Sequence, residues 1–109
     1  MLVLFDHGTP AGLARVLTDH NVFTAQSRGW DRLNNGALPT AAEADGFDIL
    51  VTTDRRIRYQ QNLSGRNIAI VVLPGSTKWS RIRCLFAPIL AAINAAIPGG
   101  YVEIEISFA

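Results

Sequence analysis

Three short runs of this sequence are apolar at nearly every position, and they constrain the fold more than any other feature. They are Met1–Phe5, Ile49–Thr53 and Ile68–Leu73. A strand that is apolar throughout is covered on both faces, which is the situation in parallel sheets flanked by helices. Runs of five or six residues are also too short for a buried helix. The sequence therefore predicts an α/β fold around a buried sheet.

The segments between these runs alternate between helix and strand. Thr9-Pro10 is a cap followed by proline at the first helical position, which predicts a helix from Pro10 to Leu17. A short strand is expected at 21–24, and a helix at 38–44 that ends at Asp45-Gly46. The 109 residues suit a single domain, 1–109. We expect a three-layer α/β/α domain with a mostly parallel central sheet of about five strands.

The C-terminal part contains the longest periodic pattern. From Ser76 or Thr77 to Ile97, apolar residues recur every three or four positions, which predicts a long helix kinked at Pro88. The last segment, 101–106, alternates apolar and polar residues and predicts an edge strand with one dry face and one wet face.

Composition narrows the class of protein. The net charge is +1, so the molecule as a whole has no strong positive electrostatic potential that would attract nucleic acid. Nine of the ten basic residues are arginine, which suits phosphate but is equally explained by a high-GC genome. The single Cys84 excludes an internal disulfide and a cysteine metal site. Without a signal-peptide pattern or a long apolar span, we expect a cytoplasmic protein that does not enter membranes.

Two aspartates are the residues of this sequence best suited to metal binding and catalysis. Asp6 and Asp54 each follow an apolar strand directly. Ligands collect outside the carboxyl ends of parallel strands, so both carboxylates are expected at one edge of the sheet. Carboxylate oxygens are suitable ligands for Mg²⁺ or Mn²⁺, and we predict Asp6 and Asp54 as catalytic, metal-binding residues. The alternative for Asp54 is that it caps a short helix over 55–59.

The other acidic residues are weaker candidates for this site. Asp48 precedes its strand and is expected at the opposite edge of the sheet. Glu43 lies on a predicted helix of undetermined facing, and Asp31 lies in a weakly patterned segment.

A basic segment follows the second aspartate. Arg55, Arg56 and Arg58, together with Thr53, are predicted to bind a substrate phosphate next to the metal. The alternative is a solvated loop in which the arginines pair with nearby acids.

These motifs together resemble a known family. The sequences at 4–10 (LFDHGTP), 46–54 (GFDILVTTD) and 59–63 (YQQNL) resemble a compact bacterial PIN-like family of unknown function, over nearly the whole chain. The wider PIN superfamily contains Mg²⁺-dependent ribonucleases, including toxins of toxin–antitoxin pairs. The resemblance thus implies a metal-dependent endoribonuclease that acts on single-stranded RNA, a cognate antitoxin and a homodimer.

The chain departs from the family pattern at one position. A glutamate usually follows the Asn-Gly turn of the family, whereas Asn35-Gly36 is followed here by Ala37. PIN nucleases generally use three or four acids. A catalytically degenerate PIN-like module that binds RNA or protein is therefore the alternative function.

A third candidate is a receiver-type phosphoacceptor domain with Asp54 as the acceptor. It is disfavoured because Asp6 is followed by His7 rather than a second acid, and Leu73 is followed by Pro74 rather than lysine.

Overall fold

The computed structural model describes residues 1–6, 9, 11–30, 33, 37–53, 67–73 and 86–104. Its strands in chain order are β1 (Leu2–Phe5), β2 (Asn21–Thr24), β3 (Ile49–Thr52), β4 (Ala69–Val72) and β5 (Tyr101–Glu103). Its helices are the α-helices α1 (Leu38–Ala44) and α4 (Phe86–Asn94) and the 3₁₀ helices η1 (Ala11–Val16) and η2 (Gln26–Arg28).

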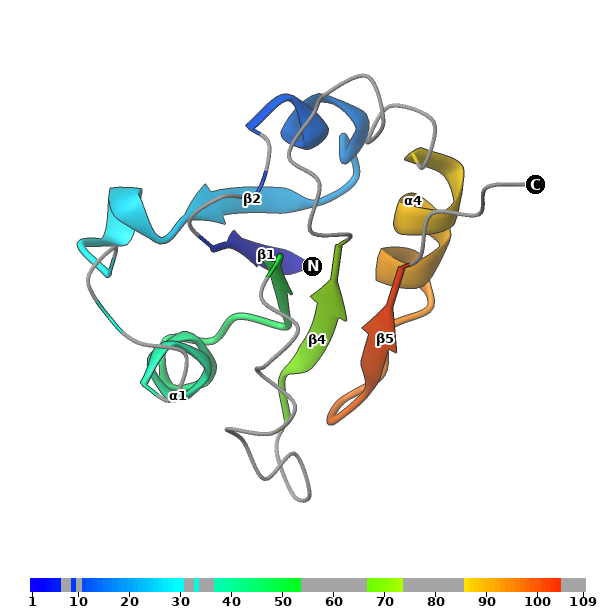
Figure 1. The fold of residues 1–109 in the computed structure, drawn as a ribbon. Coiled ribbons are helices and arrows are strands. Elements are labelled where there is room, and N and C mark those ends of the chain that lie inside the picture. Colours follow the sequence, from blue (N-terminus) through cyan, green and yellow to red (C-terminus); the bar gives the residue numbers. More distant parts are fainter. Residues whose placement is uncertain are drawn as a thin grey trace.

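The five strands of the described part form one sheet in the order β2-β1-β3-β4-β5, and every pairing is parallel (Figure 1). The prediction of a mostly parallel α/β sheet is confirmed. This order is one of the two common doubly wound arrangements, in which the chain reverses its direction of travel across the sheet between β1 and β3. In folds with this order, ligands bind outside the carboxyl ends of the two strands at which the order reverses.

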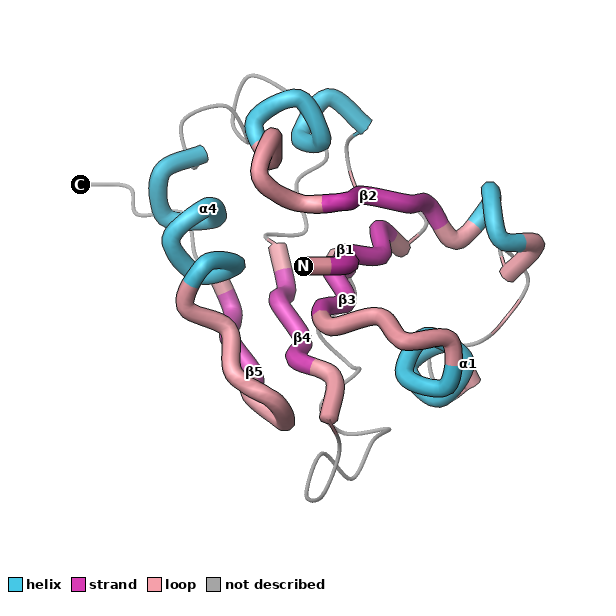
Figure 2. Tube along the Cα trace, turned by 180° about the vertical axis from the view of Figure 1, so that it is seen from behind, coloured by secondary structure: helices cyan, strands magenta, loops and turns pink. Residues whose placement is uncertain are grey.

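Helices cover both faces of the sheet and produce three layers (Figures 1 and 2). On one face, η1 and α4 contribute Leu13, Ile89 and Ile93 to a core with alternate residues of β1, β3 and β4. On the other face, α1 contributes Leu38 and Ala42 to a second core. All four residues of β3 and of β4 are buried, as their apolar sequences predict.

The end of α1 shows how local sequence fixes an element. Pro39 lies at the start of the helix, where its missing N–H removes no helical bond. Gly46 adopts a positive φ of 87°, and its N–H donates to the carbonyl of Glu43 at 3.1 Å. The N–H of Phe47 donates to the carbonyl of Ala42 at 3.0 Å, and Phe47 is buried. These two bonds form a Schellman cap with its apolar contact, so the helix ends where the Asp45-Gly46 pair predicts.

Two helices differ from their predictions. The first is a 3₁₀ helix rather than an α-helix, and the N–H of Leu17 continues its tighter pattern by donating to Ala14 at 3.2 Å. The helix α4 ends at Asn94, before the predicted end at Ile97. As a result Ile97 leaves the helical period, and it is 66% exposed instead of buried.

The final strand lies at the edge of the sheet as predicted. The predicted division into a buried apolar face and an exposed polar face is not observed. Val102 is 41% exposed, whereas Tyr101 packs against the α1-side core. Val102 pairs with Val71, so it points to the same face as α4. The helix ends too early to cover it. Ile104, the next residue on that face, is buried.

Several predictions fall outside the described residues. These are the helix start at Ser76 or Thr77, the kink at Pro88 (which depends on the turn before it), the basic segment 55–63 and the extension of the last strand beyond residue 104.

Candidate functional site

The site is built where β1 and β3 end side by side. The two strands pair in parallel with Val3 opposite Ile49 and Phe5 opposite Val51. The ladder continues one step further, because the N–H of Asp6 donates to the carbonyl of Val51 at 2.9 Å. The expectation that the first and third apolar runs are neighbours with the same direction is therefore confirmed. The carboxyl group of Asp6 lies at the carboxyl edge of the sheet.

The carboxylate of Asp6 is held by the neighbouring strand. The hydroxyl of Thr52, the last residue of β3, donates to Oδ2 of Asp6 at 2.7 Å. Thr52 is completely buried and Asp6 is partly buried. The length is that of a charge-assisted O–H···O⁻ hydrogen bond. Because Leu4 and Leu50 both belong to the α1-side core, Asp6 and Thr52 lie on that same face of the sheet two residues later.

Thr9 contacts the ends of both strands. The N–H of Thr9 donates to the carbonyl of Asp6 at 3.1 Å, and the Thr9 hydroxyl donates to the carbonyl of Val51 at 3.1 Å. The sequence predicts Thr9 as a helix cap, and the bond that the structure gives its hydroxyl goes to β3. The bonds from Asp6, Thr9 and Thr52 thus connect the ends of β1 and β3 and fix the backbone around the carboxylate.

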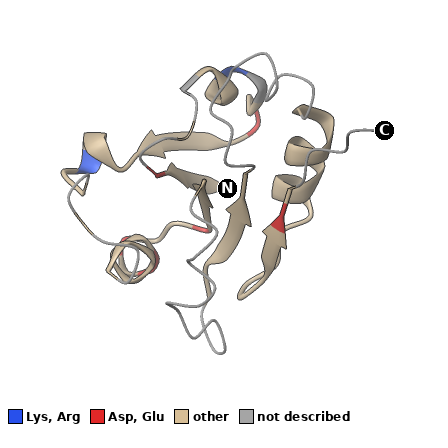
Figure 3. Cartoon of the chain, in the orientation of Figure 1, with Lys and Arg blue, Asp and Glu red and all other residues tan. Residues whose placement is uncertain are grey.

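The other described acids in the first half of the chain lie elsewhere, and Figure 3 shows acidic residues spread over several elements. Oδ2 of Asp48 accepts the N–H of Leu2 at 2.9 Å, which places it at the amino edge as predicted. Oε1 of Glu43 accepts the N–H of Asn67 at 2.9 Å, where the chain enters β4. Within the part of the chain that the structure describes, no three His, Cys, Asp or Glu side chains gather as a metal-binding group.

Glu103 is a carboxylate at the same level of the sheet that the sequence analysis did not consider. Thr52 pairs with Val72, and Val72 pairs with Glu103. Strands are about 4.8 Å apart, so three strand spacings separate Glu103 from Asp6 by roughly 14 Å between Cα atoms. Ligand distances of about 2.0–2.6 Å do not bridge that span through one ion. Glu103 accepts the Tyr101 hydroxyl at 2.7 Å instead.

Among the predicted partners of Asp6, Thr53 belongs to the described residues. Asp54, Arg55, Arg56 and Arg58 lie outside the described residues, as does Asp31. Thr53 is described, is partly buried and follows the end of β3 directly.

Thr52 and Thr9 are the site residues that the sequence analysis missed. The signal for Thr52 was present, since a hydroxyl at the end of an otherwise apolar, fully buried strand must find a hydrogen-bond partner. The identity of that partner depends on the register between β1 and β3, which the sequence does not contain.

Arg28 makes contacts within the fold that account for its position. It forms an ion pair with Asp45, and its guanidinium lies 5.4–5.7 Å from the ring centres of Phe23, Trp30 and Phe47. These contacts connect η2 to the end of α1 through cation–π and ionic attraction. The positive charge of Arg28 thus has its partners within the fold.

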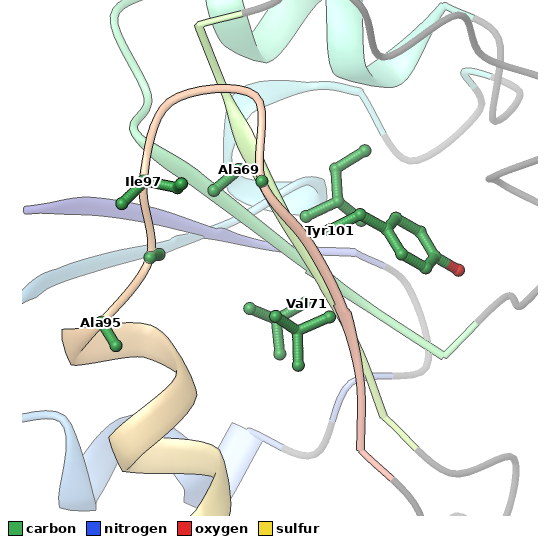
Figure 4. A pocket seen from close by; sticks show the side chains of 9 residues that line it. Ala69, Val71, Ala95, Ile97 and Tyr101 are labelled. Carbon is green, nitrogen blue, oxygen red and sulfur yellow. The ribbon is translucent and has the colours of Figure 1, made fainter.

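A pocket of about 390 Å³ lies away from the carboxyl edge. It is formed where the chain leaves α4 and enters β5, and Ala69, Ala95, Ile97 and Tyr101 line it (Figure 4). Its remaining lining residues are glycine or aliphatic, so it has little to orient a polar substrate. The pocket and the Asp6 site are therefore separate features.

No helix in the described ranges is long and apolar enough to cross a membrane. Comparisons with protein-family models, curated proteins and solved structures give no match for this chain.

Proposed function

We propose that this chain is a metal-dependent ribonuclease whose active site lies at the carboxyl edge between β1 and β3. The observation that carries the proposal is the Asp6 carboxylate, held by Thr52 at the point where the doubly wound sheet reverses its order. This is the position at which folds of this type bind their ligands. The resemblance to PIN-like proteins supplies the reaction class.

Asp6 and Asp54 are the proposed ligands of one Mg²⁺ or Mn²⁺ ion, and Asp54 is the next residue in the chain after Thr53. The donor chemistry fits, because Mg²⁺ often takes one or two carboxylates and completes its shell with waters and substrate phosphates. A ligating carboxylate is normally hydrogen-bonded in turn, as Asp6 is by Thr52. Such an ion supplies charge neutralisation at a phosphodiester and activation of water.

Single-stranded RNA is the proposed substrate. Thr53, Arg55, Arg56 and Arg58 are the proposed phosphate-binding residues, since they follow β3 directly in the sequence and arginine binds phosphate with two parallel hydrogen bonds. By the same resemblance, we propose a cytoplasmic toxin with a cognate antitoxin.

Metal titration tests the proposal. Wild type and the Asp6→Asn, Asp54→Asn and Asp48→Asn variants are titrated with Mn²⁺ by calorimetry, and cleavage of a fluorescent single-stranded RNA is followed in Mg²⁺. We expect millimolar or tighter Mn²⁺ binding and RNA cleavage in wild type and Asp48→Asn, because Asp48 lies at the opposite edge of the sheet. Both should be lost in the Asp6 and Asp54 variants. Equal Mn²⁺ binding by wild type and Asp6→Asn would contradict the proposal.

A non-catalytic module that binds RNA or protein is the second candidate. The observation that favours it is the position of the described acids, because Glu43 and Asp48 bind backbone N–H groups away from Asp6. A second metal ion normally requires more negative charge than two aspartates provide. This candidate predicts that wild type binds RNA but gives no heat with Mn²⁺ and does not cleave.

We also propose that the protein forms a homodimer through the surface of α4 and the segment after it. Residues 86–102 contain no charged residue, although Ala87 and Ala91 are exposed on α4 and Ala95 is exposed directly after it. A surface helix usually presents polar residues to water. Ile97 is 66% exposed and lines the apolar pocket, so this surface presents an apolar side chain and an apolar pocket to a second copy across a two-fold axis.

Sedimentation velocity over a range of protein concentrations tests the dimer. Ala91→Lys should yield a monomer, because it places like charges in the shared surface. Ala44→Lys, on the exposed end of α1, is the matched control and should leave the dimer intact. A monomeric wild type at all concentrations would exclude the dimer.

A further inference from the structure

We infer that Thr52 is a positioning residue that sets the orientation of the Asp6 carboxylate for cation binding. The inference rests on the proposed metal function of Asp6. It adds a residue that neither the acid pattern of the sequence nor the arginine segment points to. The inference is based on the 2.7 Å hydrogen bond from the Thr52 hydroxyl to Oδ2 of Asp6, which joins two adjacent strands.

The backbone on both sides of this bond is fixed. The N–H of Asp6 donates to Val51 at 2.9 Å, and the carbonyl of Thr52 accepts the N–H of Leu73 from β4 at 2.7 Å. Donor and acceptor are thus attached to ladders of the same sheet. Sites on strands hold their geometry better than sites on loops, so the distance between the two side chains is preset.

The Thr52 side chain is itself restricted. A β-branched residue has few χ1 rotamers available. Thr52 is 0% exposed, so bulk water does not compete for its hydroxyl. A buried hydroxyl without a partner is costly, which keeps its proton directed at the carboxylate.

Packing alone does not account for threonine at this position. Its cross-strand neighbour on β4 is Val72, which is also completely buried and has nearly the same shape. Valine would fill the space without a hydroxyl to satisfy. The hydroxyl is explained by the carboxylate that it contacts.

The consequence is a carboxylate with a fixed plane. Donation to Oδ2 restricts rotation of the group about its last torsion, which is broad for an unrestrained aspartate. A cation ligand that is already oriented loses less freedom on binding. Loss of such an outer partner typically lowers metal affinity by about 10- to 100-fold.

Three variants test the role of the hydroxyl. Thr52→Val removes it with little change in shape, and Thr52→Ser retains it without the methyl group. Thr24→Val is the matched control, because Thr24 ends β2 on the other side of β1 and its hydroxyl accepts a bond from Ser27 instead. Mn²⁺ affinity is measured by electron paramagnetic resonance of free Mn²⁺, and folding is followed by urea denaturation of the same samples.

We expect the dissociation constant for Mn²⁺ to rise about 10- to 100-fold in Thr52→Val. Thr52→Ser and Thr24→Val should remain within about threefold of wild type. If Thr52→Val binds Mn²⁺ as tightly as wild type, or if Thr52→Ser loses as much affinity as Thr52→Val, the positioning role is wrong while the proposed function stands. If wild type takes up no Mn²⁺, both fall together.

Discussion

At the scale of single residues, two aspartates occupy opposite ends of the same strand pair. Asp48 accepts the N–H of Leu2 before β1 and β3 begin to run together, and its own N–H donates to the carbonyl of Leu2. Asp6 lies where the pair ends. The first carboxylate therefore stabilises the start of the sheet, whereas the second lies at the carboxyl edge, where folds of this type bind their ligands.

Replacement of Asp48 by alanine should lower the free energy of unfolding by about 1 kcal/mol, because the N–H of Leu2 loses its charged acceptor. Water replaces part of that bond at this exposed position. Urea denaturation measures the change, and Mn²⁺ affinity should be unaffected. An Asp48→Ala variant with weakened Mn²⁺ binding would contradict the separation of the two edges.

At the scale of elements, packing rather than helical hydrogen bonding holds the first crossover. The helix η1 has only six residues in the tighter 3₁₀ geometry, which is poor in hydrogen-bond energy. Its Leu13 is completely buried between the sheet and α4. The segment is fixed because this side chain and Leu17 fill the core.

Leu13→Ala should therefore destabilise the protein by about 2–5 kcal/mol, the range for deleting a buried leucine side chain. Arg15→Ala, an exposed substitution in the same helix, should change stability by about 0.5 kcal/mol or less. Thermal and urea unfolding of both variants test this. A small effect at Leu13 would mean that η1 is not part of the core.

At the scale of the whole molecule, stability should decrease from the centre of the sheet to its edges. β3 and β4 are buried at every position, whereas three of the four residues of β2 are exposed. The β2 edge is partly closed by Ser27, whose hydroxyl and N–H both bind Thr24. Such local bonds limit pairing with another chain.

Amide hydrogen exchange followed by NMR should show this gradient. The amides of β3 and β4 are expected to exchange slowest, near the global unfolding limit, and those of the edge strand β2 much faster. Equal protection of β2 and the central strands would contradict the gradient.

The strand order alone does not choose the chemistry. The order β2-β1-β3-β4-β5 is shared by flavodoxin-like and receiver domains, and fold does not imply function. Because His7 follows Asp6 and Pro74 rather than lysine follows Leu73, we expect no phosphorylation of Asp54 by a small phosphodonor. Intact-mass spectrometry after such incubation measures this. A stable phosphoryl adduct on Asp54 would favour the receiver-type alternative instead.

Much of this fold was accessible from local sequence. The bounds of β2 and α1 agree with their predictions, and β1, β3 and β4 agree within one residue at each end. Buried strands require unbroken apolar runs, and a Gly at positive φ ends α1, so both signals are local. The exposure of Ile97 and Val102 was not predicted, because it depends on where α4 stops relative to β5.

For the candidate site, the sequence by itself determined that Asp6 follows a buried strand and is therefore delivered to the carboxyl edge of a parallel sheet. Tertiary structure alone decided that Thr52 contacts it and that Glu43 does not. The reason is physical. Order along a strand is set by neighbours in the chain, whereas register between strands is set by pairing between residues more than forty positions apart.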